Sequence, residues 1–210
     1  MSRQRTLVIA CGALAREINQ LKKTNGWEHL ELTCIDAALH FTPLKIPAAL
    51  RERIRENRDQ YDDIYIAYAE CGTQGEIDKI IEEEEIERLP GAHCYQFFAG
   101  EQSFTEMSEA EPGTFYLTDF LVRHFDRLVM RSLGLDKHPE LRDMYFGNYK
   151  RVIYLSQTMD EKLVEGARRA AETLGLAFEQ VHTGYGDLET SLRQKLDGNA
   201  DAQENNHLLA

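Results

Sequence analysis

The sequence has no excess of basic residues and no long apolar run. Its 24 lysines and arginines are outnumbered by 36 aspartates and glutamates, which gives a formal net charge of −12. Because phosphate backbones and anionic lipids are bound by basic surfaces, we expect no nucleic acid and no membrane among its partners. No apolar stretch approaches the roughly 20 residues that cross a bilayer, and the chain starts with a short strand pattern instead of a signal sequence. We therefore expect a soluble, cytoplasmic protein.

Cysteine is scarce, and its four copies form no C-x-x-C pair. In the reducing cytosol that we expect, such cysteines are free, metal-bound or catalytic more often than disulfide-bonded. Nucleotide-binding fingerprints are also missing. The loop Gly72-Thr73-Gln74-Gly75 lacks the lysine of a Walker loop and the third glycine of a Rossmann loop. The placement of the cysteines is therefore the most informative feature of the sequence.

Strand and helix patterns alternate along most of the chain. Short apolar runs predict strands, and apolar residues three or four apart predict helices. Strands are expected at 6–10, 30–35, 64–69, 113–118, 151–155 and 177–182, while 94–100 fits either a strand or a helix. This alternation predicts an α/β fold with a mostly parallel, doubly wound sheet and helices on both faces. We expect one domain over 1–196 and a flexible polar tail over 197–210.

Two of the predicted strands end on a Cys-Gly pair. Cys11 follows the first strand, and Cys71 follows the strand at 64–69. The carboxyl ends of parallel strands share one rim, where ligands of α/β sheets bind, so both thiols are expected there. Cys94 lies next to His93, and these four residues are candidates for holding zinc or an iron–sulfur cluster. The adjacent glycines favour a site, because they allow backbone or ligand to approach closely.

The thiols also allow two other interpretations. Cysteine often packs as a small hydrophobic residue at a strand end, and a single activated cysteine acts as a nucleophile or redox group. Cys34 alternates with leucines inside its strand and is expected in the core. His40 lies just past that strand, where it is either a ligand or acid–base group on the rim or a cap of its loop.

Several loops are candidates for holding a small-molecule ligand. The turn Gly72-Thr73-Gln74-Gly75 precedes a helix, so its backbone N–H groups are candidates for binding an anion, with an ordinary tight turn as the alternative. Tyr185 follows the last predicted strand and is expected on the same rim. Aromatic segments at 113–119 and 145–149 either wall a pocket or pack in the core. The role of Glu70 stays open.

Six ordered motifs carry a resemblance to a known family. They are Ile9-Ala10-Cys11-Gly12-Ala13-Leu14, Glu70-Cys71-Gly72-Thr73-Gln74-Gly75, His93-Cys94-Tyr95, Pro112-Gly113-Thr114-Phe115-Tyr116-Leu117-Thr118, Tyr145-Phe146-Gly147-Asn148-Tyr149 and Thr183-Gly184-Tyr185-Gly186. Over about 7–196 the chain resembles the bacterial and archaeal family called domain of unknown function 1638. Glu70 departs from the Asp expected there. The resemblance implies no particular reaction, but genes of that family often lie near corrinoid proteins and corrinoid-dependent methyltransferases, which implies a link to one-carbon metabolism.

The leading prediction is a metal-binding protein with a cysteine-rich site on the carboxyl rim of its sheet. It would act as an enzyme or accessory factor in one-carbon, methyl-transfer or small-molecule metabolism. One alternative is a non-catalytic partner or chaperone of a corrinoid protein or methyltransferase, and another is a metal-free hydrolase with a cysteine nucleophile. The expected residues are Cys11, Cys71, Cys94 and His93 for the metal, and Gly72, Thr73, Gln74, Gly75 and Tyr185 for the ligand.

Overall fold

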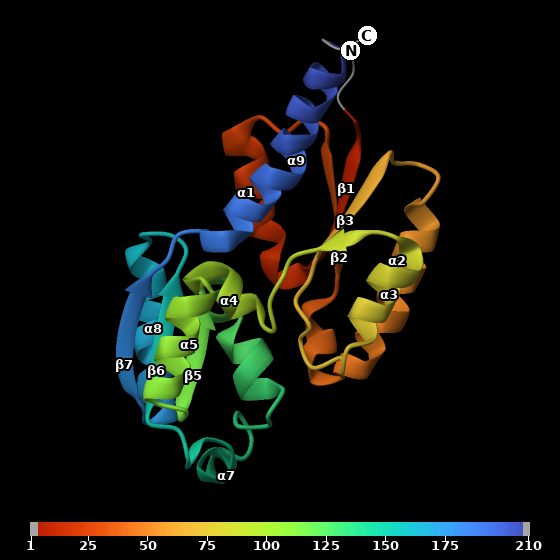
Figure 1. The fold of residues 1–210 in the computed structure, drawn as a ribbon. Helices are drawn as coiled ribbons and strands as arrows, with labels where there is room; N and C mark the ends of the chain where they lie inside the picture. The colour runs from red at the N-terminus through yellow and green to blue at the C-terminus, as the bar shows by residue number, and fades with distance from the viewer. Residues whose placement is uncertain (1–3, 208–210) are drawn as a thin grey trace. The chain divides into compact units, whose positions relative to one another are not determined.

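The computed structural model describes residues 4–207, and the side chains of residues 4–197. The chain divides into two compact units, each with its own sheet (Figure 1). The first unit takes in the chain up to Cys94 and from Asp187 onward, and the second unit is Tyr95–Gly186. The predicted α/β class with parallel strands is confirmed, although the strands form two sheets where the sequence predicts one. The assignment of 1–196 to one domain stays a prediction.

The first unit contains a parallel sheet with the strand order β2-β1-β3-β4. Its strands are β1 (Thr6–Cys11), β2 (Leu30–Ile35), β3 (Asp63–Ala67) and β4 (Glu87–Arg88). All six residues of β1 are buried, because this strand has a neighbour on each side and helices on both faces. The chain runs from β1 to β2 on one side and then crosses to β3 on the other side. The strand order therefore reverses between β1 and β3.

Helices cover both faces of the first sheet. Figure 1 shows α1 and α9 on one face and α2 and α3 on the other. The helices are α1 (Ala15–Asn25), α2 (Ile46–Asn57), α3 (Glu76–Glu84) and α9 (Gly186–His207), with 3₁₀ turns η1 (Gly12–Leu14), η2 (Ala37–Phe41) and η3 (Pro43–Lys45).

Helix α9 is held to the first unit by one apolar stripe. Leu188, Leu192 and Leu196 recur every four residues and are at most 3% exposed. The Trp27 indole N–H also donates a hydrogen bond to Asp197, at 3.0 Å. The helix continues to His207, into the segment 197–210 that the sequence predicts to be a flexible tail. The flexibility of 197–210 stays a prediction.

The second unit contains a parallel sheet with the strand order β5-β6-β7. Its elements are β5 (Thr114–Thr118), β6 (Arg151–Ser156), β7 (Ala177–His182), α4 (Cys94–Ala99), α5 (Glu101–Ala110), α6 (Asp119–Arg123), α7 (Arg142–Phe146) and α8 (Glu161–Leu174), with a π-helical segment at Asp126–Arg131 and a 3₁₀ turn at Pro139–Leu141. The segment at 94–100, which fits either structure by sequence, is thus helical.

Side chains of the second sheet alternate between two cores, as the two-residue period of a strand requires. Tyr116, Ile153 and Leu155 pack toward α4 and α5. Leu117, Val152 and Tyr154 pack in the other core, which contains the apolar side of α8. Across the described residues, no helix has both the length and the apolar character that spanning a membrane requires.

Candidate metal centre

Two cysteines follow neighbouring strands of the first sheet at its carboxyl edge. Cys11 is the last residue of β1, and Cys71 lies four residues beyond the end of β3. These strands are neighbours in parallel register, so the chain leaves both of them at the same edge. The strand order reverses between β1 and β3, and open α/β sheets bind ligands outside the carboxyl ends of the strands at such a reversal.

Potential metal ligands converge at this edge. One ligand atom from each of His40, Cys71 and Cys94 lies within 4.8 Å of the others. The two sulfur atoms of Cys71 and Cys94 are 3.7 Å apart. Cys11 Sγ lies 3.9 Å from His40 Nδ1. Cys11 is fully buried, Cys71 and Cys94 are half-buried, and His40 is exposed on part of its surface.

His40 reaches the edge because the turn η2 packs closely over the end of β1. A Cβ atom on Gly12 would lie 3.2 Å from the Ile35 carbonyl oxygen and 3.4 Å from the Ala37 nitrogen, so a side chain at position 12 would push this segment away. The His40 ring lies nearly parallel to the Tyr68 ring, with centroids 6.0 Å apart. Its Nδ1 lies 3.2 Å from the Ala37 carbonyl oxygen.

Cys71 is held by a loop that folds around the carboxylate of Glu70. This carboxylate accepts hydrogen bonds from the N–H groups of Gly72 and Gly75, at 2.8 and 3.0 Å, and from the Thr73 hydroxyl at 3.0 Å. Cys71 has a φ of 50°, in the left-handed region that non-glycine residues rarely adopt. Partial burial opposes ionisation of Glu70, but hydrogen bonds from the Gly75 and Gly72 N–H groups lower its pKa.

The segment before Cys94 is tied directly to the Cys71 loop. The Cys71 N–H donates to the Ala92 carbonyl at 3.0 Å, and the Glu70 N–H donates to the Gly91 carbonyl at 3.2 Å. These two backbone bonds keep the two thiols near each other. Since Gly72 and Gly75 already donate to Glu70, an anion held by 72–75 would need other groups of the loop. Ligand binding by Gly72, Thr73, Gln74 and Gly75 stays a prediction.

The members of the cluster shift one another's pKa values in different directions. A hydrogen bond from Cys94 lowers the pKa of Cys71 to about 5, against the effect of burial and with help from His40. The same hydrogen bond, together with burial, raises the pKa of Cys94 well above its usual value. Burial lowers the pKa of His40, but hydrogen bonds to the sulfurs of Cys11 and Cys71 outweigh this effect and raise the pKa to about 10. The metal-free cluster thus holds a Cys71 thiolate beside an imidazolium.

Tyr68 lies beneath the cluster and was not singled out by the sequence. Its side chain is fully buried, and its hydroxyl makes no well-formed hydrogen bond in the described part of the chain. Burial raises the pKa of Tyr68, and the neighbouring Cys11 sulfur raises it further, together with Cys71 and Cys94. Its place at the carboxyl end of β3, three residues before Cys71, is the signal that would have identified it.

The structure brings together some of the predicted metal ligands and leaves others aside. Cys71 and Cys94 belong to the converging group, and Cys11 lies beside it, with its sulfur 3.9 Å from His40 Nδ1. His93 is exposed and outside the group, although its charge contributes to the low pKa of Cys71. His40, which the sequence leaves undecided between ligand and loop cap, takes the place predicted for His93.

Two further residues singled out by the sequence lie outside the converging group. Cys34 is partly buried in β2, and burial raises its pKa. Tyr185 is half-buried in the second unit, and its role as a ligand-binding residue stays a prediction.

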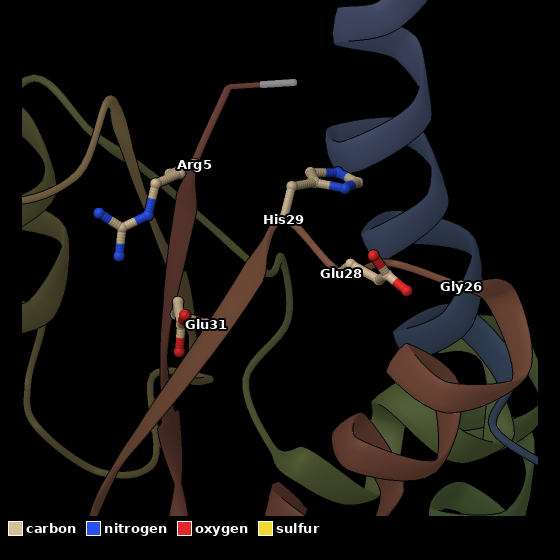
Figure 2. Close-up of a pocket in the computed structure, with 5 residues that line it drawn as sticks. All are labelled: Arg5, Gly26, Glu28, His29 and Glu31. Carbon is tan, nitrogen blue, oxygen red and sulfur yellow. The ribbon is translucent and has the colours of Figure 1, made fainter. Parts of the chain in front are cut away.

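A pocket of about 390 Å³ lies at the opposite, amino-terminal edge of the first sheet. It is lined by Arg5, Gly26, Glu28, His29 and Glu31. Figure 2 shows the Arg5 and His29 side chains pointing away from each other. Because its charged groups do not converge on a point, this pocket is a weaker candidate for a functional site than the thiol cluster.

Comparison with known proteins gives a family but no reaction. No curated protein matches the chain. A solved structure of ornithine carbamoyltransferase from Pyrococcus furiosus matches with 13% identity and a TM-score of 0.25, over 86% of this chain and 55% of that one. The chain thus spans about half the length of that enzyme. The family model described as "Protein of unknown function (DUF1638)" matches residues 34–192, more than half of the chain, and the protein belongs to that family.

Proposed function

We propose that the protein binds one thiophilic divalent metal ion, zinc in the first place, through His40, Cys71 and Cys94. The observation that carries this proposal is the 3.7 Å separation of the two sulfurs beside an imidazole. Two thiolates at about 2.3 Å from one zinc ion, at the tetrahedral angle, have their sulfurs about 3.8 Å apart. Ligands of different irons in a cluster lie farther apart, so this spacing favours a single ion over an iron–sulfur cluster.

The hydrogen bond of the histidine supports the same assignment. A carbonyl oxygen can only accept, so the 3.2 Å contact with the Ala37 oxygen places the proton of neutral His40 on Nδ1. The lone pair then lies on Nε2, which is free to bind a metal. Metal-bound histidines usually donate their other ring N–H in this way, which fixes the tautomer and the ring orientation.

Cys11 fits a position next to the metal ligands better than a position as a ligand of the metal itself. Its sulfur accepts the Ala13 N–H at 3.5 Å and faces the Nδ1 side of His40 at 3.9 Å. The metal would then have two thiolates, one imidazole and an exchangeable fourth ligand. Structural zinc sites are closed by four protein ligands, whereas catalytic sites keep one position for water or substrate. We therefore propose an enzyme site.

The reaction class that suits such a site is activation of a thiol or transfer of a methyl group in one-carbon or small-molecule metabolism. A metal bound by thiolates favours the deprotonated form of an incoming sulfur ligand. The further step to a corrinoid protein or methyltransferase as partner rests on the family resemblance alone. An accessory or chaperone role for such a partner is the non-catalytic version of this proposal.

Metal content tests the proposal. The protein is purified without oxygen, as wild type and as Cys71→Ser, and its zinc and iron are measured per chain. We expect about one zinc per wild-type chain and a loss of it in Cys71→Ser, because a hydroxyl is a poor ligand for zinc. Cys34→Ser, which changes a cysteine outside the cluster, is the matched control and should keep its metal. Folded wild-type protein that takes up no zinc would sink the proposal.

A metal-free cysteine nucleophile is the second candidate. It is favoured by the thiolate that the low pKa of Cys71 implies and by the imidazole beside it. A chelator separates the two candidates. If activity toward a thioester or amide survives complete removal of metal and is lost on alkylation of Cys71, the nucleophile is the better assignment.

A further inference from the structure

We infer that the Tyr68 hydroxyl binds the ligand at the exchangeable metal position, and that this ligand is a small thiol bound as its thiolate. The inference rests on the metal site proposed above and adds to it a ligand class and a residue that selects for it. Its basis is a fully buried hydroxyl beside the sulfur cluster that makes no well-formed hydrogen bond among the described residues, where its polar neighbour is the Cys11 sulfur.

A buried hydroxyl without a partner is costly and rare in folded proteins, so one found beside a ligand site calls for an explanation. Phenylalanine would fill the same volume without that cost. Tyr68 lies at the carboxyl end of β3, where the strand order reverses, and its ring is stacked under the ring of His40. A ligand on the metal held by His40 is therefore within the surroundings of this hydroxyl.

The net charge of the metal site indicates which kind of ligand the Tyr68 hydroxyl would contact. Thiolates of Cys71 and Cys94 with a neutral imidazole cancel the two positive charges of the ion. A thiol that gives up its proton to solvent on binding then leaves one net negative charge in a half-buried place. The phenol O–H is a donor that can share this charge, and hydrogen bonds to charged acceptors are stronger than neutral ones. A ligand that stays neutral would gain less.

The test uses the full chain loaded with cobalt(II), which replaces zinc and reports each bound thiolate by its sulfur-to-metal charge-transfer absorption. The probe is 2-mercaptoethanol. Wild type should show a saturable increase in this absorption. Tyr68→Phe should bind cobalt as tightly as wild type but bind the thiol at least roughly tenfold more weakly. Tyr65→Phe, which removes the hydroxyl of another buried tyrosine in β3, should behave as wild type.

Each outcome decides the inference. If wild type binds cobalt but its spectrum does not change with thiol, or if Tyr68→Phe binds the thiol as well as wild type does, the inference is wrong and the metal site stands. If wild type binds no cobalt, both are wrong. Because the hydroxyl makes no well-formed hydrogen bond, Tyr68→Phe should unfold at a temperature no lower than wild type. Unfolding or a large loss of stability in this variant would show a structural partner and overturn the inference.

Discussion

The carboxyl edges of the two sheets carry similar residue types but use them differently. At the first edge, Cys71, Cys94 and His40 converge with electron pairs that a metal could accept. At the second edge, the buried Asp119 carboxylate accepts hydrogen bonds from the Tyr154 hydroxyl at 2.6 Å, the Gln157 N–H at 3.0 Å and the Thr158 hydroxyl at 2.5 Å. Its polar groups thus hold its own loops together.

Strand order accounts for much of this difference. In the first sheet the order reverses between β1 and β3, and the loops leaving strands at such a reversal diverge, which is where open α/β sheets bind ligands. In the second sheet the strands follow one another in chain order, and the loops leaving them lie side by side. Ser156 and His182 form a contact of 3.2 Å there, but Ser156 is fully buried and so is unsuited to attack a substrate. Serine and histidine are common catalytic residues, but Ser156 and His182 have a structural role here.

Matched histidine substitutions at the two edges give the largest expected difference. His40→Gln should weaken zinc binding at least roughly a hundredfold, because loss of an outer partner of a metal ligand already costs 10–100-fold and His40 is proposed as a ligand itself. His182→Gln removes a histidine from the second edge and should leave zinc affinity unchanged. Competition with a chromophoric chelator measures both affinities. Equal zinc affinities of His40→Gln and His182→Gln would show that the two edges do not differ in metal binding.

The second expected effect is a loss of folding stability on substitution at the carboxyl edge of the second sheet. Asp119→Ala leaves three donors without their acceptor and should lower the free energy of unfolding by about 3 kcal/mol. Asp126→Ala removes an exposed acid paired with Arg131 and should cost less than about 1 kcal/mol. Chemical denaturation measures both changes. If Asp119→Ala instead abolished zinc binding in protein that remains folded, the two edges would not have separate roles.

The sequence predicts most of the elements but only part of the site. The strand at Leu30–Ile35 and the strand at Ala177–His182 have the predicted bounds, because apolar spacing and flanking turn residues act locally. The division into two sheets depends on which strands pair, and no local pattern reports that. The sequence leaves the role of His40 undecided for a similar reason. Its position depends on how closely η2 packs against Gly12, which is a contact between segments far apart in the chain.

Thiol reactivity should distinguish Cys71 from Cys34 within the first unit. In metal-free protein at pH 6, Cys71 should be alkylated by iodoacetamide at least roughly tenfold faster than Cys34. With a pKa of about 5, Cys71 is mostly thiolate at this pH, whereas burial raises the pKa of Cys34 above the usual value of a thiol. The advantage in thiolate is partly offset, because nucleophilicity falls as the pKa of a thiol falls.

The pH dependence follows from the sign of these shifts. The rate at Cys71 should rise as the pH passes about 5 and then level off, while the rate at Cys34 should still be rising at pH 9. Peptide mapping after brief labelling measures both rates in one sample. A Cys71 rate that keeps rising tenfold per pH unit from 6 to 8 would show that its thiol is not acidified by the cluster.

The smallest expected effect concerns the loop that sets the position of Cys71. Glu70→Ala removes the acceptor for the Gly72 and Gly75 N–H groups, so the left-handed conformation at Cys71 loses its support. Zinc affinity should fall roughly tenfold, which is typical for loss of a residue that orients a metal ligand. Glu82→Ala, which removes an exposed acid from α3 at the same cost in charge, is the control and should change the affinity little.

The two glutamate variants separate geometry from charge. If both weaken zinc binding equally, the negative charge of the surface attracts the ion and the loop has no special part. If only Glu70→Ala weakens it, the backbone around Cys71 sets the affinity. In that case the carboxylates of the two edges have comparable structural roles. Glu70 orders the loop that carries a metal ligand, and Asp119 orders loops that carry none. What distinguishes the first edge is then the thiols and imidazole that its ordered loops carry.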